Sequence, residues 1–215
     1  MIFAAHQPNL LPYLGWWAKL EESDRFGLMA GAQFSKGDYH NRVRIGWDDS
    51  PRWLTVPVKV TLGERIDEVE IAEHYQASSL LAILDATYAR YASWANYRDD
   101  IQDMLEEYEP GSRLIGLSRH LIGWLRTKLE AKTEIVEMPM TNEDPSERLA
   151  RWTEETGCNV YLSGRGGRSY LDEAPFHRRG LEVRYQEAHM QYGYQKVSAL
   201  TALIDHGVDW RKVLA

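Results

Sequence analysis

The pattern of apolar and polar positions predicts alternating strands and helices at the start of the chain. Residues 1–5 form a short apolar run that suits a buried strand, and residues 13–22 place Leu14, Trp17 and Leu20 largely on one face of a helix. Residues 24–30 return as a second strand. Because parallel strands need a crossover connection, this order predicts a β-α-β unit and the beginning of a parallel sheet.

The middle of the chain has a helical pattern. Apolar residues recur at three- and four-residue spacing from Ser78, and we expect the helix to continue through residues 97–108. Pro110 and Gly111 end it, and Ser112 is placed to cap a second long helix, so that a helical segment covers about residues 78–132. Residues 134–138 then predict a strand, Pro145 the start of a helix to residue 156, and residues 198–206 the last helix.

These elements predict an α/β fold with a central, mostly parallel sheet flanked by helices. The length of 215 residues fits either one large domain or two small ones. We expect a single domain over residues 1–215 that contains the helical middle segment.

A polar turn framed by prolines separates the first strand from the first helix. It holds His6, Gln7 and Asn9, with Pro8 and Pro12 limiting the freedom of the backbone. In open parallel sheets, ligands bind beyond the carboxyl ends of the strands, so the turn predicts a ligand site. The alternative is that Asn9 only caps the helix and His6 is a satisfied buried histidine.

A second candidate is the stretch from Gln33 to Ile45. If it is extended, Arg42 and Arg44 lie on one face with Lys36 before them, which forms a cradle for phosphate or carboxylate. The alternative is a solvated edge strand whose charges oppose aggregation. Residues 53–60 follow as an apolar strand, in which Pro57 indicates a sheet edge or a bulge.

The third candidate stretch, residues 157–171, has the pattern of a strand, a glycine-rich turn and a helix. Such a turn lets backbone N–H groups approach an anion closely. It lacks the lysine and spacing of a phosphate-binding P-loop and the spacing of a dinucleotide fingerprint. Ser163, Gly164, Gly167 and Tyr170 are its candidate ligand contacts.

Composition narrows the class of protein. The chain is 44% hydrophobic without a long apolar segment, and its start lacks the pattern of a secretion signal, so we expect a cytoplasmic protein with no membrane span. The single cysteine, Cys158, excludes an internal disulfide and fits a reducing compartment. The net charge of −7 argues against broad nucleic-acid binding. The scattered histidines and the adjacent pairs Asp48-Asp49 and Asp99-Asp100 predict no metal site, and no cofactor is assigned.

Taken together, these segments resemble the WbqC-like family. The matching residues are His6-Gln7-Pro8-Asn9 with Pro12 and Gly15, Gln33-Phe34-Ser35-Lys36, Asn41-Arg42, Arg44-Ile45, Trp53 to Val58, and Tyr161-Leu162-Ser163-Gly164 with Gly167 and Tyr170-Leu171. The resemblance runs through most of the chain. It implies a biosynthetic protein of a surface-polysaccharide or specialised-metabolite pathway.

The resemblance also implies a shared ligand site, because separated polar residues recur as a set. These residues are His6, Asn9, Lys36, Asn41, Arg42 and Arg44. Our hypothesis is that Lys36, Arg42 and Arg44 hold an anionic group, with backbone donors from the turns at Asn9 and at Gly164 to Gly167. His6 and Asn9 are the candidate catalytic residues, with His6 as general base in acyl or aminoacyl transfer to an amino sugar or small amine. Gln7, Gln33, Lys59, Ser163, Gly164, Gly167, Tyr170 and Gln195 complete the expected substrate contacts.

Three positions depart from the family pattern. A glutamine is expected where His40 stands, a proline is expected before Gln195, and an aspartate is expected about where Thr201 stands. Two other functions stay open. A nucleotidyltransferase would use a similar turn, but Trp16 and Trp17 occupy the place of its second histidine. A non-catalytic subunit would present an anionic small molecule to a pathway enzyme or a carrier.

Overall fold

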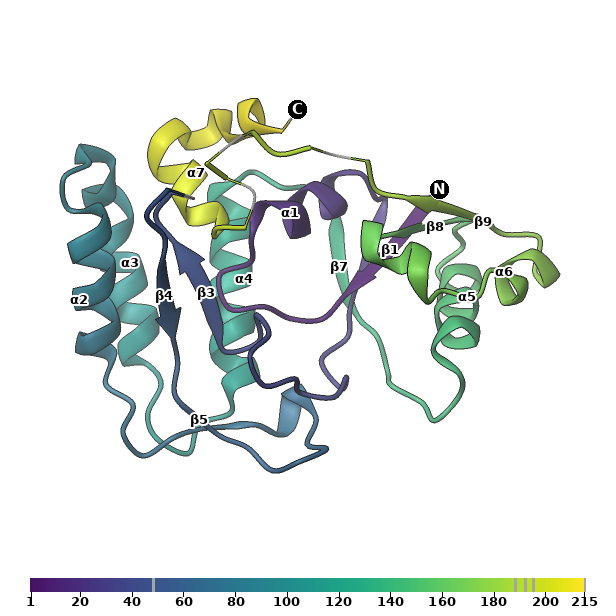
Figure 1. Ribbon diagram of the computed structural model, residues 1–215, viewed down its shortest axis with the longest axis horizontal. Coiled ribbons are helices and arrows are strands. Elements are labelled where there is room, and N and C mark those ends of the chain that lie inside the picture. Colours follow the sequence, from purple (N-terminus) through teal and green to yellow (C-terminus); the bar gives the residue numbers. More distant parts are fainter. Residues whose placement is uncertain (48, 188, 192, 195, 215) are drawn as a thin grey trace.

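The computed structural model describes residues 1–47, 49–187, 189–191, 193–194 and 196–214 (Figure 1). The predicted contact Gln195 and Asp48 of the first acidic pair lie outside the described residues. The centre is a parallel five-stranded sheet, which confirms the predicted α/β fold. Its order is β7 (Glu134–Glu137), β2 (Arg25–Leu28), β1 (Ile2–His6), β8 (Val160–Ser163) and β9 (Glu182–Tyr185).

Helices cover both faces of the sheet. Phe3 of β1 pairs with Tyr161 of β8, and both pack in a hydrophobic cluster with α5 (Pro145–Glu155) and α6 (Ala174–Arg178). The next pair, Ala4 and Leu162, belongs to a larger cluster with α1 (Leu14–Glu21), α4 (Leu114–Lys128) and α7 (Ala199–His206). The inner strands β1 and β8 are covered on both faces and are largely apolar rather than alternating, whereas the edge strands β7 and β9 carry charged residues.

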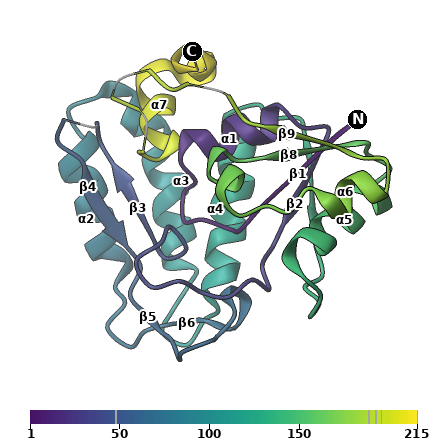
Figure 2. The same ribbon diagram turned by 45° about the vertical axis from the view of Figure 1, so that its right-hand side comes forward.

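The connections of the sheet create a switch point beside β1. From β1 the chain moves outward to β2 and then β7, and it then returns to the other side of β1 to form β8 and β9. Figure 2 shows β1 and β8 side by side, with β9 beyond them. In open α/β sheets, ligands bind in the crevice at this point, beyond the carboxyl ends of the strands. The topology therefore predicts a ligand site at the carboxyl ends of β1 and β8.

The long connection from β2 to β7 forms the other half of the molecule, at the left of Figure 1. It contains two antiparallel strand pairs and three helices. These are β3 (Arg42–Ile45) with β4 (Arg52–Thr55), β5 (Val58–Lys59) with β6 (Glu70–Ile71), and α2 (Ala77–Tyr88), α3 (Ala95–Glu106) and α4. Four short 3-10 helices complete the described elements, at Ile66–Glu68, Ala92–Trp94, Arg165–Ser169 and Gly207–Val213.

Two of the predicted helix boundaries are wrong. The helix does not run continuously from residue 78 to 108, because the chain folds back after α2 and Asp85 accepts hydrogen bonds from Trp94 and Arg98 of the returning segment. Ser112 does not cap α4, which begins after Arg113. The Ser112 hydroxyl instead accepts the N–H of Glu109 and closes the preceding turn.

Three further local predictions also need correction. Pro57 separates β4 from β5, so residues 53–60 are not one strand. The turn after β8 leads into a 3-10 helix, because Gly167 and Tyr170 make short-range backbone bonds to residues three before them. Asn9 does not cap α1, whose N-cap residue is Tyr13.

The larger hydrophobic cluster joins the sheet to the middle helices. It contains Trp16 and Phe26 from the sheet region together with Leu84 and Leu117 from the helical segment. We therefore expect one cooperative unfolding transition, with the same midpoint by far-UV circular dichroism and by tryptophan fluorescence. Two separated midpoints would contradict the prediction of a single domain.

Candidate functional site

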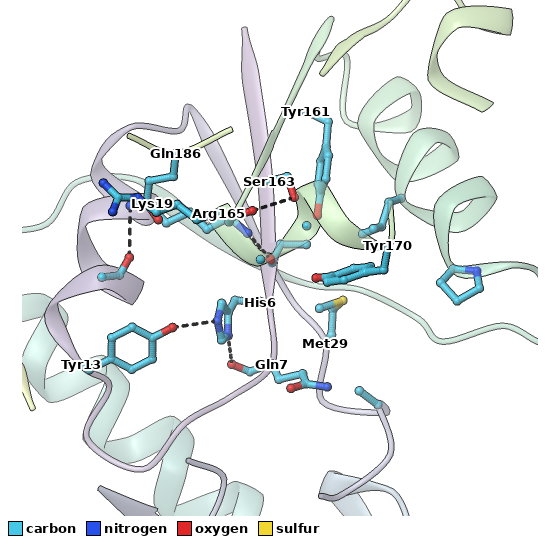
Figure 3. Close-up of a pocket in the computed structure, with 18 of the residues that line it drawn as sticks. His6, Gln7, Tyr13, Lys19, Met29, Tyr161, Ser163, Arg165, Tyr170 and Gln186 are labelled. Atoms are coloured by element: carbon cyan, nitrogen blue, oxygen red, sulfur yellow. Dashed lines mark hydrogen bonds between the residues drawn. The ribbon is translucent and has the colours of Figure 1, made fainter. Parts of the chain in front are cut away.

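A cavity of about 740 Å³ lies at the carboxyl ends of β1, β2 and β8, where the topology has its switch point (Figure 3). This volume is typical of small-molecule sites. The lining includes six residues that the sequence predicted as site residues: His6, Gln7, Ser163, Gly164, Gly167 and Tyr170. Two of the three candidate segments, the turn after β1 and the turn after β8, are thus brought together.

His6 is the last residue of β1, and its hydrogen bonds define its protonation. Its Nδ1 lies 2.9 Å from the carbonyl oxygen of Gln7, which can only accept, so Nδ1 carries the hydrogen. Nε2 then carries no hydrogen and can accept one, and it lies 3.4 Å from the hydroxyl of Tyr13. Burial, together with the charge of Lys19, lowers the pKa of His6 to about 4. At neutral pH the ring is therefore a neutral proton acceptor.

The lowered pKa of His6 predicts a loss of stability in acid. Since the unfolded histidine has the higher pKa, the unfolded state binds more protons below pH 6.5, and the free energy of unfolding falls by up to about 3 kcal/mol by pH 4. We expect His6→Gln to lose less stability than the wild type over this range in urea unfolding. His74→Gln, which changes an exposed histidine, is the control. Equal losses in the wild type and His6→Gln would contradict the pKa assignment.

Lys19 is a cavity residue that the sequence pattern did not reveal. Its side chain is only 5% exposed, and its Nζ donates a 2.8 Å hydrogen bond to the carbonyl of Ala5 in β1. Burial lowers the pKa of Lys19 to about 8. A charge in the first amphipathic helix is normally solvated, but Lys19 stands four residues after Gly15, on the helix face that meets the cavity. This four-residue spacing from Gly15 is the feature of the sequence from which Lys19 could have been predicted to face the cavity.

The lining of the cavity is strongly cationic. Lys19, Arg148, Arg165 and Lys196 contribute to it, whereas no aspartate or glutamate appears among the described lining residues. The whole chain, by contrast, has a net charge of −7. Because like charges in one concave site repel and focus a positive potential, the arrangement favours an anionic ligand.

The turn after β8 packs tightly on its own strand. A Cβ on Gly167 would lie 2.0 Å from Oγ of Ser163, so the absence of a side chain at this position lets the turn close. Gln186, which follows β9, donates to the carbonyl of Gly15 at 3.3 Å and so ties this side of the cavity to α1. Sequence reasoning did not identify Gln186, because its segment carried no recognisable pattern.

Asn9 and Asn41 lie outside the cavity lining and stabilise the backbone. Asn9 is 3% exposed, and the amide orientation that satisfies its surroundings has the nitrogen donating to the carbonyls of Gln7 at 3.3 Å and Pro8 at 3.2 Å. Asn41 donates to the carbonyl of Val56 at 2.8 Å. Both amides satisfy carbonyl groups of irregular segments, which buried backbone requires.

The predicted basic cradle also lies outside the lining of the cavity. Arg42 stacks on Trp53 with 4.2 Å between its guanidinium carbon and the ring centre, and Arg44 pairs with Trp53 across the two strands. These side chains therefore share the solvent-facing side of the β3–β4 pair. Gln33, Lys36 and Lys59 are exposed in neighbouring segments of the same connection. None of the residues of the predicted cradle lines the cavity.

Two departures from the family pattern have structural roles. His40 is 1% exposed, and its Nδ1 lies 3.4 Å from the Pro8 carbonyl, so it connects residues 39–41 to the turn after β1. Thr201 is fully buried and shares a 2.8 Å hydrogen bond with Tyr88. Neither residue lines the cavity.

The described residues contain no group of three or more histidine, cysteine, aspartate or glutamate side chains placed to hold a metal ion. Among the helices of the described ranges, none has the length and apolar character needed to cross a membrane.

The fold and the cavity define a doubly wound parallel α/β protein with a cation-lined cavity at its switch point. The sequence profile of the WbqC-like protein family matches residues 7–202, and the chain belongs to this family. A Mycobacterium tuberculosis protein described as uncharacterized, Rv1507c, is 27% identical over 183 residues, which cover 83% of this chain and 79% of that protein. No solved structure matches the chain.

Proposed function

We propose that the protein is a biosynthetic enzyme that transfers an acyl or aminoacyl group from an anionic donor to an amino sugar or a related small amine. The observation that carries this proposal is the neutral His6 ring, with Nε2 as acceptor, in a cavity lined by four cations. A proton acceptor beside an anion site is the combination that such a transfer needs.

The proposed chemistry uses two residues of the cavity. The acceptor nitrogen attacks the acyl carbonyl, a C–N bond forms, and the bond from the carbonyl to the donor's leaving group breaks. His6 Nε2 takes the proton from the acceptor and passes it to the leaving group. The Lys19 ammonium holds the negative charge of the donor and stabilises the oxyanion of the intermediate.

A thermal-shift panel tests which compounds bind, because a ligand of the native state raises the melting temperature. It includes nucleoside triphosphates, nucleotide sugars, amino acids and coenzyme A thioesters, with the wild type, Lys19→Met and Arg42→Ala. We expect a specific shift that Lys19→Met loses. A shift lost only in Arg42→Ala would assign the anion to the predicted cradle. No shift from a folded protein would favour a subunit that needs a pathway enzyme or a carrier-bound substrate.

The position of His6 at a switch point also supports nucleotidyl transfer as a second candidate. Against it, Trp16 and Trp17 are fully buried core residues at the place of the second histidine. Release of pyrophosphate from a nucleoside triphosphate, coupled to consumption of an acceptor, would favour nucleotidyl transfer over acyl transfer.

A further inference from the structure

Two glycines of the turn after β8 line the cavity although the fold does not require glycine there. A Cβ added to Gly164 or Gly166 would have no atom within 4 Å, and neither backbone has a positive φ. Gly167, in contrast, is required by its contact with Ser163. The absence of side chains at Gly164 and Gly166 leaves the backbone of the turn open to the cavity, where an anion can approach closely.

Tyr170 lies at the end of the same turn and on the rim of the cavity. Its side chain is 77% exposed, which is unusual for a large aromatic residue, and no other aromatic ring of the described chain stacks on it. In Figure 3, Tyr170 lies beside Met29, across His6 from Tyr13 and Lys19. One segment thus presents an open backbone for an anion and a free ring for a planar group.

We infer that the cavity binds a nucleoside diphosphate group, with its phosphates on the open backbone of Gly164 and Gly166 near Lys19 and its base stacked on Tyr170. The inference rests on the proposed function and names the anionic part of its donor. The cationic lining suits two phosphates, the 740 Å³ volume holds a group of this size, and aromatic side chains stack on bases of any sequence.

Isothermal titration calorimetry with UDP, ADP, inorganic pyrophosphate and uridine tests this inference. We expect both nucleotides to bind more tightly than pyrophosphate, and uridine to show no binding at millimolar concentration. Tyr170→Ala should weaken UDP binding about tenfold and leave pyrophosphate unchanged, because only the stacking on the base is removed. If pyrophosphate bound as tightly as UDP, the nucleoside would contribute nothing to binding, and the inferred stacking of the base on Tyr170 would be wrong.

The glycines give the sharper test, because the variants are expected to fold. Gly166→Ala should keep or raise the melting temperature and weaken both UDP and pyrophosphate at least tenfold, since its methyl group occupies the path of the phosphate. Gly123→Ala, at an exposed glycine of α4 whose Cβ also meets nothing within 4 Å, is the matched control with unchanged binding. Unchanged binding in Gly166→Ala would overturn the placement of the phosphates.

This inference and the proposed function fail separately. Binding of a non-nucleotide anion that is lost in Lys19→Met would overturn the nucleoside diphosphate and keep the anionic donor. Nucleotide binding with the predicted variant effects, but with turnover unchanged by His6→Gln, would keep the ligand and overturn the role of His6 in the transfer.

Discussion

Replacing His6 with glutamine is expected to lower turnover by about 100-fold or more while ligand binding is kept. The glutamine amide can still donate to the Gln7 carbonyl, which His6 Nδ1 contacts at 2.9 Å, but it supplies no basic nitrogen at the place of Nε2. The measurement is single-turnover kinetics with the donor from the binding panel, alongside calorimetry with the same donor.

The control for this variant is His74→Gln, which changes an exposed histidine outside the cavity lining and should keep wild-type turnover. The pH profile provides a second readout. Because the pKa of His6 is about 4 in the free protein, activity should not fall between pH 8 and pH 6 through this group. Unchanged turnover in His6→Gln would exclude His6 as the base.

The fold was predictable from the sequence where local pattern and tertiary packing agree. The strand before His6, the helix from Tyr13 and the strand after Asp24 depend on short-range periodicity, and the parallel β-α-β arrangement follows from them. The break between α2 and α3 was not predictable in this way. It depends on the contacts of Asp85 with Trp94 and Arg98, and periodicity contains no information about such tertiary bonds.

The site was predictable in part, for a related reason. His6 and Ser163 end two parallel strands, and the rule for ligand sites in open sheets indicates such ends directly. Arg148 and Lys196 join them through helix and loop packing that no local pattern specifies. The pattern that drew attention to Arg42 and Arg44 was local alternation, which identifies a shared face but not what that face meets.

Lys19→Met is expected to weaken binding of the anionic donor about 30-fold or more, because it removes a buried charge of the cavity at nearly constant side-chain volume. Calorimetry with the donor measures the change. Lys132→Met, which removes an exposed lysine outside the lining, should bind as the wild type does. Equal binding by Lys19→Met and the wild type would show that Lys19 does not hold the anion.

Lys19→Met should also be more stable than the wild type at neutral pH. Burial removes water from the charged ammonium group of Lys19, which destabilises the folded state. The pKa of Lys19 is lowered from 10.5 to about 8, which corresponds to about 3 kcal/mol, less about 1 kcal/mol for the lost bond to Ala5. Because the unfolded lysine holds its proton up to pH 10.5, this contribution makes the wild type gain stability as pH rises from 8 to 10.5. Urea unfolding should show that the stability advantage of Lys19→Met over the wild type falls across this range and reverses near pH 10.5, and a constant difference would mean that Lys19 is not the titrating group.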